Sequence, residues 1–154
     1  MVARACLGEL PPEPATYVLL LRLKCPVDLT VGKLGRFSFP CGCYAYVGSA
    51  HGPGGLAARI ARHLRRAKTL HWHIDYLRAH AQPVAVCYYV GEERCECRWA
   101  RAFATMTGAE TPAARFGASD CRCPSHLFHF ATTPDLAAFG QAVEERILME
   151  TFSD

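Results

Sequence analysis

Apolar residues gather in four short segments of the chain, at residues 16–24, 43–48, 84–90 and 127–131. Aliphatic, β-branched and aromatic side chains dominate these segments, and glycine or proline lies close to their ends, which predicts β-strands. We expect the first strand to be largely buried, because it is almost entirely apolar. Residues 27–42 contain glycine, proline and aspartate with only a few spaced apolar residues, which predicts a loop or a small hairpin.

A helical pattern follows the second strand. Leu56, Ile60 and Leu64 are four positions apart and form one apolar stripe, which predicts a helix over residues 56–67. Further helices are expected over 72–80, 97–106 and 135–149, the last capped by Asp135. This order of elements predicts an α/β (α+β) fold, in which a small mixed or antiparallel central sheet is flanked by helices.

The 154 residues are about the length of one domain. Pro11, Pro12 and Pro14 separate a short tail, residues 1–13, from a domain at 14–131, and the helix at 132–154 is expected to pack on that domain. The chain has no apolar run of the roughly 18 residues that a membrane helix needs, and its N-terminus lacks the apolar segment of a signal peptide. We therefore expect a cytoplasmic protein without a membrane partner.

Positive charge is concentrated in one part of the chain, whose net charge is +3. The cationic residues between positions 59 and 68, with no acid among them, are Arg59, Arg62, Arg65, Arg66 and Lys68. They predict an anionic partner, in the first place a nucleic acid, although a solvated helix face has the same pattern.

An aromatic and histidine-rich segment follows the basic residues. His71, Trp72 and His73 are predicted to contact a nucleic-acid strand, with Trp72 stacked on a base. The alternative is hydrogen bonding at a helix start or in the core, where His71 and Asp75 lie four residues apart on one face.

The chain has nine cysteines, and this odd number in a chain of this length argues against a disulfide framework. The candidates for a zinc site are Cys95, Cys97, Cys121, Cys123 and His126. Zinc sites usually place two to four residues between paired cysteines, whereas these pairs enclose one, so free thiols are the expected state. A cysteine-rich interaction domain without a nucleic-acid partner is a third interpretation of the chain.

Several motifs occur in order along the chain: TYV at 16–18, YVG at 46–48, Arg59-x-x-x-His63, and Glu96 at the start of a helix. The longer strings around and after them are GCYAYVGSAHGPGGLAARIARHLR, HWHIDYL and FGASDCRCPSHLF. Together they resemble the GIY-YIG nuclease superfamily, and most closely its uncharacterised branch, domain of unknown function 123. That branch is found alone or fused to endonuclease III-type DNA glycosylases. The resemblance covers roughly residues 14–130.

The resemblance implies a metal-dependent endonuclease that hydrolyses DNA phosphodiester bonds, and the glycosylase fusions point to repair or structured DNA. Tyr46 would act as general base or position the attacking water, and Tyr17 would assist it or hold the phosphate. Arg59 would neutralise the phosphate, a role suited to its fixed fork of donors. His63 would move a proton or contact the phosphate. Glu96 would bind one divalent ion, Mg²⁺ or Mn²⁺.

The chain departs from the superfamily pattern in two places. Ala15 replaces the glycine of GIY, and no asparagine is present to follow Glu96. These departures favour the alternative of a non-catalytic nucleic-acid-binding module that keeps the basic helix. Glu92 and Glu93 are the fallback for Glu96. The glycine-rich turn at 49–55 offers a backbone cradle for phosphate, but it lacks the Gly-Lys-Ser/Thr ending of a P-loop, and a tight bend is the expected interpretation.

Overall fold

The computed structural model describes residues 3–4, 10–66 and 68–152. The strands are β1 (Ala3–Arg4), β2 (Ala15–Leu23), β3 (Val27–Val31), β4 (Gly35–Phe39), β5 (Gly42–Ala50), β6 (Gln82–Val90), β7 (Leu127–Phe130) and β8 (Leu148–Thr151). The helices are α1 (Gly55–Leu64), α2 (His73–Arg78), α3 (Glu96–Ala104) and α4 (Leu136–Val143). None of these helices, in the part of the chain described, is long and apolar enough to cross a bilayer.

One central sheet has the strand order β1-β8-β6-β2-β5-β7, and β3 and β4 form a separate hairpin. All neighbours in the central sheet are antiparallel except β1, which lies parallel to β8. β2 lies between β5 and β6, in a register that pairs Tyr17 with Gly48 and Leu19 with Tyr46. This confirms the expected α+β class, with an antiparallel sheet and helices beside it.

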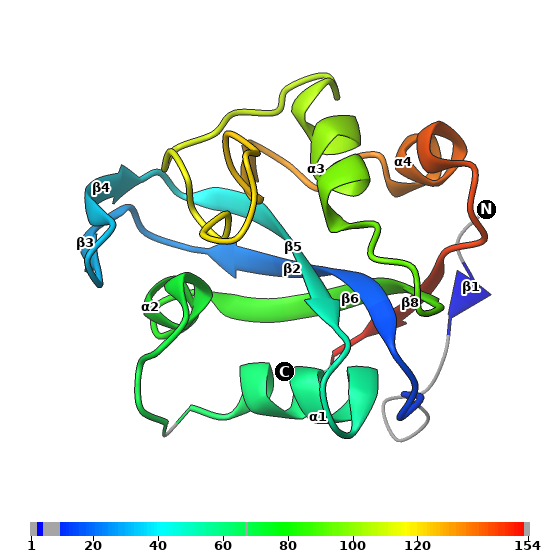
Figure 1. Ribbon diagram of the computed structural model, residues 1–154. Helices are drawn as coiled ribbons and strands as arrows, with labels where there is room; N and C mark the ends of the chain where they lie inside the picture. The colour runs from blue at the N-terminus through cyan, green and yellow to red at the C-terminus, as the bar shows by residue number, and fades with distance from the viewer. Residues whose placement is uncertain (1–2, 5–9, 67, 153–154) are drawn as a thin grey trace.

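Helices cover both faces of the sheet (Figure 1). The odd-numbered residues of β2, such as Tyr17 and Leu19, pack with α1 and α2, whereas Val18 and Leu20 pack with α3 and α4. A strand buried on both faces needs apolar residues at successive positions, which is why β2 is almost entirely apolar instead of alternating with polar residues. Tyr17 and Tyr46 both belong to the core on the α1 side.

The predicted strands and the small hairpin are confirmed, but the expected helix over 135–149 is wrong in its second half. α4 ends at Val143 because Glu144 adopts a left-handed conformation, with φ of 57°. Residues 148–151 then form β8, which pairs with β6 and β1. This segment becomes an inner strand because β6 and β1 pair with it on its two sides, although its apolar spacing also suits a helix.

Helix α1 ends at Leu64, three residues before the expected end, because Arg65 adopts an extended conformation, and other side chains bind the carbonyls at this end. Lys68 Nζ donates hydrogen bonds to the carbonyls of Arg62, His63 and Arg65. The Arg78 guanidinium donates to the carbonyls of His63 and Leu64. Cationic side chains at a helix C-terminus satisfy free carbonyls and complement the helix dipole.

The segment expected as a tail, residues 1–13, touches the fold at two places. β1 pairs with β8, and the carbonyls of Pro11 and Glu13 accept hydrogen bonds from the backbone N–H groups of Ala57 and Leu56. The approach is so close that a Cβ at Gly55 would lie 2.2 Å from the Pro12 carbonyl oxygen. This contact supports the N-terminus of α1.

Candidate active site

Tyr17 and His63 form the buried centre of the candidate site. The Tyr17 hydroxyl, on β2, shares a 2.7 Å hydrogen bond with Nε2 of His63, on α1. Tyr17 is 1% exposed and His63 is 0% exposed. The structure thus brings together two of the predicted catalytic residues. Neither side chain reaches solvent, so in this conformation the pair lies beneath the surface at which a phosphate would bind.

Tyr46 lies beside this pair and is half-buried. Its ring centroid is 6.5 Å from that of Tyr17 and 6.1 Å from that of His63. Two glycines make room for the rings, since an added Cβ would lie 2.5 Å from the Tyr17 ring at Gly48 and 2.9 Å from the Tyr46 ring at Gly117. The glycine of the YVG motif is therefore explained by the close approach of Tyr17 from the paired strand.

Burial determines the protonation states of the three rings. Loss of hydration raises the pKa of Tyr17, and it raises the pKa of Tyr46 to about 12 although the charge of Arg59 opposes the shift. Burial, followed by the charges of Lys68 and Arg59, lowers the pKa of His63 to about 3. All three rings are therefore uncharged at neutral pH, and the Tyr17–His63 hydrogen bond joins a neutral phenol to a neutral imidazole.

Arg59 brings positive charge to the same place. It lies one helical turn before His63, and its Nη1 donates a 2.7 Å hydrogen bond to the Ser49 carbonyl. Its guanidinium carbon lies 4.5 Å from the centre of the Trp72 ring. These contacts hold the guanidinium in place and leave further N–H donors. Arg59 also lines a hollow of about 200 Å³, so an anion in this hollow would lie beside a fixed cation.

Glu96 is the first residue of α3, as predicted, and its Oε2 is buried without a hydrogen-bond partner among the described residues. Burial raises the pKa of Tyr46 and lowers that of His126; the charge of Glu96 adds to the first shift and opposes the second, so the carboxylate lies within electrostatic reach of both rings. A buried carboxylate oxygen without a partner is the kind of atom that a bound ion satisfies. Oxygen ligands suit Mg²⁺, so this residue fits the predicted role.

Hydrogen bonds and a cation–π contact join Arg62, Trp72 and Asp75 into one cluster between α1 and α2. Arg62 donates hydrogen bonds of 2.9 and 2.8 Å to the two carboxylate oxygens of Asp75, and its guanidinium carbon lies 3.7 Å from the centre of the Trp72 ring. Asp75 Oδ2 also accepts the backbone N–H groups of His71 and Trp72. Arg62 and Trp72, predicted to contact nucleic acid, therefore hold α1 and α2 together.

The other predicted nucleic-acid contacts divide into two groups. Lys68 caps α1, and His73 Nδ1 accepts a 2.8 Å hydrogen bond from the backbone N–H of Gly117, so both side chains have structural roles. Arg65, Arg66 and His71 are exposed. These three remain available to a ligand.

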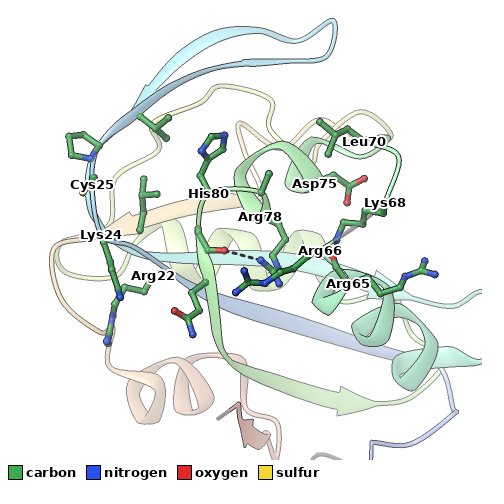
Figure 2. Close-up of a pocket in the computed structure, with 16 residues that line it drawn as sticks. Arg22, Lys24, Cys25, Arg65, Arg66, Lys68, Leu70, Asp75, Arg78 and His80 are labelled. Atoms are coloured by element: carbon green, nitrogen blue, oxygen red, sulfur yellow. Dashed lines mark hydrogen bonds between the residues drawn. The ribbon is translucent and has the colours of Figure 1, made fainter. Parts of the chain in front are cut away.

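A larger hollow of about 510 Å³ lies next to the C-terminal end of α1, and its cationic lining is visible in Figure 2. The basic residues that line it are Arg22, Lys24, Arg65, Arg66, Lys68, Arg78 and His80. Arg22 and Lys24 were not among the residues predicted to contact nucleic acid. Both are exposed cations at the end of an apolar strand, and this pattern in the sequence could have identified them. The hollow extends the basic surface from α1 to β2.

The glycine-rich turn at 49–55 does not offer a phosphate cradle at the N-terminus of α1. The backbone N–H groups of Leu56 and Ala57 donate to the carbonyls of Glu13 and Pro11, and Gly55 N–H donates to the Gly52 carbonyl. Donors that are already bound within the chain are not free for an anion. The expected alternative of a tight bend is therefore the one that the structure adopts.

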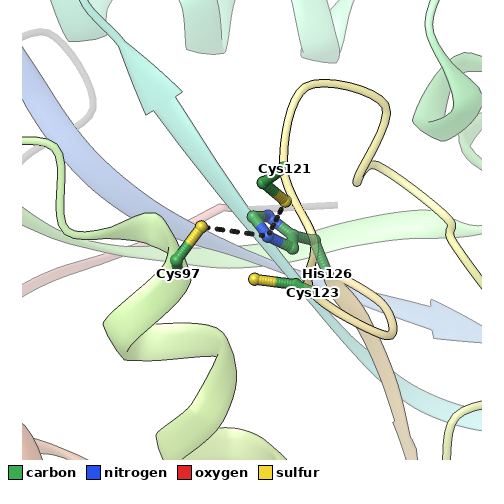
Figure 3. Close-up of side chains that lie close together, drawn as sticks. All are labelled: Cys97, Cys121, Cys123 and His126. Atoms are coloured by element: carbon green, nitrogen blue, oxygen red, sulfur yellow. Dashed lines mark hydrogen bonds between the residues drawn. The ribbon is translucent and has the colours of Figure 1, made fainter.

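Four of the five zinc candidates converge at the first turn of α3 and the loop that precedes β7 (Figure 3). The ligand atoms of Cys97, Cys121, Cys123 and His126 all lie within 4.8 Å of one another. Cys95 is not part of this group, because its sulfur accepts from Arg98 and contacts the Glu93 carbonyl. The three thiols are free, as expected, but they form a compact cluster with His126 that the one-residue spacing did not predict.

A comparison with known protein families matches residues 16–148 to the domain of unknown function DUF123. The chain belongs to this family. No curated protein matches the chain, and no solved structure does. The part that matches DUF123 runs from β2 to β8 and includes Tyr17, Tyr46, Glu96 and the thiol cluster.

Proposed function

We propose that this DUF123 domain is a metal-dependent endonuclease that hydrolyses phosphodiester bonds of DNA. The observation that carries the proposal is the convergence of Tyr17, Tyr46, Arg59 and His63 from β2, β5 and α1 around one site. These are the residues to which the GIY-YIG resemblance assigns catalytic roles. The basic hollow beside α1 supports a polyanionic substrate.

The side chains suggest a division of labour in hydrolysis. Tyr46, half-buried and neutral, would orient a water molecule toward the phosphorus through its hydroxyl. Arg59 would donate to the non-bridging oxygens, whose negative charge increases in the transition state. Tyr17 and His63 would hold Tyr46 and Arg59 in place, because their buried hydrogen bond keeps the Tyr17 hydroxyl neutral and fixed in orientation.

Glu96 would hold the divalent ion through its unpartnered Oε2. Such an ion, Mg²⁺ or Mn²⁺, supplies positive charge for the phosphate and lowers the pKa of a bound water. One carboxylate ligand suits Mg²⁺, which keeps several of its waters.

The deciding experiment measures strand cleavage on a labelled panel of single-stranded, duplex, flap, splayed-arm and abasic DNA, with Mg²⁺ or Mn²⁺. We expect metal-dependent cleavage by the wild type and a loss of about 100-fold or more in Glu96→Gln, because the ion contributes several kcal/mol to the transition state. Glu92→Gln is the matched control, since Glu92 is exposed and lies four residues earlier. Cleavage that Glu96→Gln leaves intact, or that Glu92→Gln removes, would refute the assigned metal ligand.

A nucleic-acid-binding module without turnover is the second candidate, favoured by the size and charge of the hollow in Figure 2. Binding without cleavage on every substrate and with either ion would support this candidate and exclude the nuclease.

Both candidates predict that Arg65 and Arg66 contact phosphates. Each substitution, Arg65→Ala or Arg66→Ala, should weaken DNA binding and reduce the slope of log K against log salt by about 0.9 on duplex DNA. Binding titrations at several salt concentrations measure this slope. Arg36→Ala, on the exposed part of the β3–β4 hairpin, is the control and should leave the slope unchanged. An unchanged slope in the first two variants would place the DNA elsewhere.

A further inference from the structure

The thiol cluster beside the candidate active site has the composition and closeness of a metal centre. Its three sulfur atoms and one imidazole nitrogen come from α3 and from the loop before β7, and they point toward one another in Figure 3. His126 Nε2 lies 3.4 Å from the Cys121 sulfur and 4.0 Å from the Cys97 sulfur. Zinc–ligand bonds of about 2.0–2.3 Å at tetrahedral angles place the ligand atoms about 3.5–3.8 Å apart.

We propose that Cys97, Cys121, Cys123 and His126 bind a structural Zn²⁺ ion. Three thiolates and one imidazole complete a tetrahedral shell, so the ion would have no open position for a substrate. Sulfur ligands also distinguish this ion from the Mg²⁺ or Mn²⁺ assigned to Glu96, since those ions prefer oxygen. The site goes beyond the proposed nuclease function and does not depend on it.

The histidine is held in the orientation that a zinc ligand needs. His126 Nδ1 lies 3.3 Å from the backbone carbonyl of Val47, which leaves Nε2 to face the three sulfur atoms. A metal-binding histidine typically donates its second nitrogen in this way, because the hydrogen bond fixes the tautomer and the ring. His126 and Cys123 are buried, with 3% and 8% exposure, whereas Cys97 and Cys121 are half-buried, so the cluster lies at the edge of the core.

The loop is shaped around the cluster by an arginine. Arg115 donates hydrogen bonds to the carbonyls of Ala118, Cys121 and Cys123, which brings two of the cysteines together. Zn²⁺ with three thiolates carries a net charge of about −1. The positive charges of Arg115 and Arg101 act on His126 and Cys123, respectively, and they oppose this negative charge.

The ion would stabilise the candidate active site from two sides. Cys97 directly follows Glu96, so binding at Cys97 fixes the first turn of α3 beside that carboxylate. The same loop contains Gly117, where an added Cβ would lie 2.9 Å from the Tyr46 ring. One ion would thus hold α3 and the loop on the two sides of Tyr46 and Glu96.

The test is the metal content of the full chain, purified from cells without added zinc and measured by plasma mass spectrometry. We expect about one zinc per chain, and at least a tenfold loss of zinc in Cys97→Ser and Cys123→Ser. Cys95→Ser is the matched control: it removes a buried cysteine two residues from Cys97 but outside the cluster, and it should keep its zinc.

Folded wild-type protein without zinc, whether it holds iron, no metal or a disulfide among these cysteines, overturns the proposal. This result decides the matter even where a cysteine variant fails to fold. Reconstitution with Co²⁺ provides a second measurement. Co²⁺ added to the zinc-free wild type should give the visible absorption bands of a tetrahedral cobalt–thiolate complex. Neither measurement uses DNA cleavage, so the zinc site and the nuclease function can fail separately.

Discussion

Replacing Tyr46 by phenylalanine is expected to slow DNA cleavage by about 10²-fold, because the attacking water loses the hydroxyl that orients it and misplacing a reacting group costs roughly this factor. The substitution removes one hydroxyl and keeps the ring that packs against Tyr17 and His63. Folding and DNA binding should therefore change little. Single-turnover cleavage with Mg²⁺, measured beside a binding titration of the same preparation, separates the chemical step from substrate affinity.

Tyr44→Phe is the matched control for this prediction. Tyr44 lies on the same strand and the same face as Tyr46, but its hydroxyl donates to the Pro40 carbonyl, away from Arg59 and His63. We expect Tyr44→Phe to cost some stability and to keep the cleavage rate. Wild-type cleavage by Tyr46→Phe would show that the chemistry uses another group.

Asp75→Ala is expected to reduce the free energy of unfolding by about 3 kcal/mol, near the lower end for a broken buried ion pair because Arg62 retains some solvent contact. Asp75 is 1% exposed and Arg62 is 21% exposed. The substitution removes the ion pair with Arg62, which has two hydrogen bonds. It also leaves two backbone N–H groups near the start of α2 without the carboxylate that accepts their hydrogen bonds. Urea or thermal unfolding measures the loss, and Asp28→Ala on the exposed hairpin is the control.

The same carboxylate predicts a pH dependence. Burial alone would raise the pKa of Asp75, but hydrogen bonds from Arg62, His71 and Trp72 lower it from 3.8 to about 2. A pKa lowered by folding stabilises the native state above the unfolded value, and this stabilisation is lost as the pH falls toward the folded value. The difference in unfolding free energy between wild type and Asp75→Asn should therefore shrink between pH 3.8 and about 2. A constant difference would contradict the ion-pair account.

The sequence alone placed the two tyrosines and the Arg59–His63 pair on adjoining elements. Strand periodicity put Tyr46 on one face of β5, and the spacing of four residues put Arg59 and His63 on one side of α1. Both patterns depend on the local geometry of a single strand or helix, which the order of residues fixes directly. For this reason the fold class could be predicted, together with the strands and the helix that carry these four residues.

Contacts between distant segments were decided only by the tertiary structure. The one-residue spacing in Cys121-x-Cys123 argued against zinc, yet the fold brings these thiols to Cys97 and His126. The density of positive charge predicted that Arg62 and Lys68 contact nucleic acid. In the structure Arg62 binds Asp75, and Lys68 binds carbonyls at the end of α1. A side chain's partner depends on which elements pack beside it. Sequence patterns describe one helix or strand at a time. They therefore identified the charged and metal-binding side chains, but not the partner that each side chain binds.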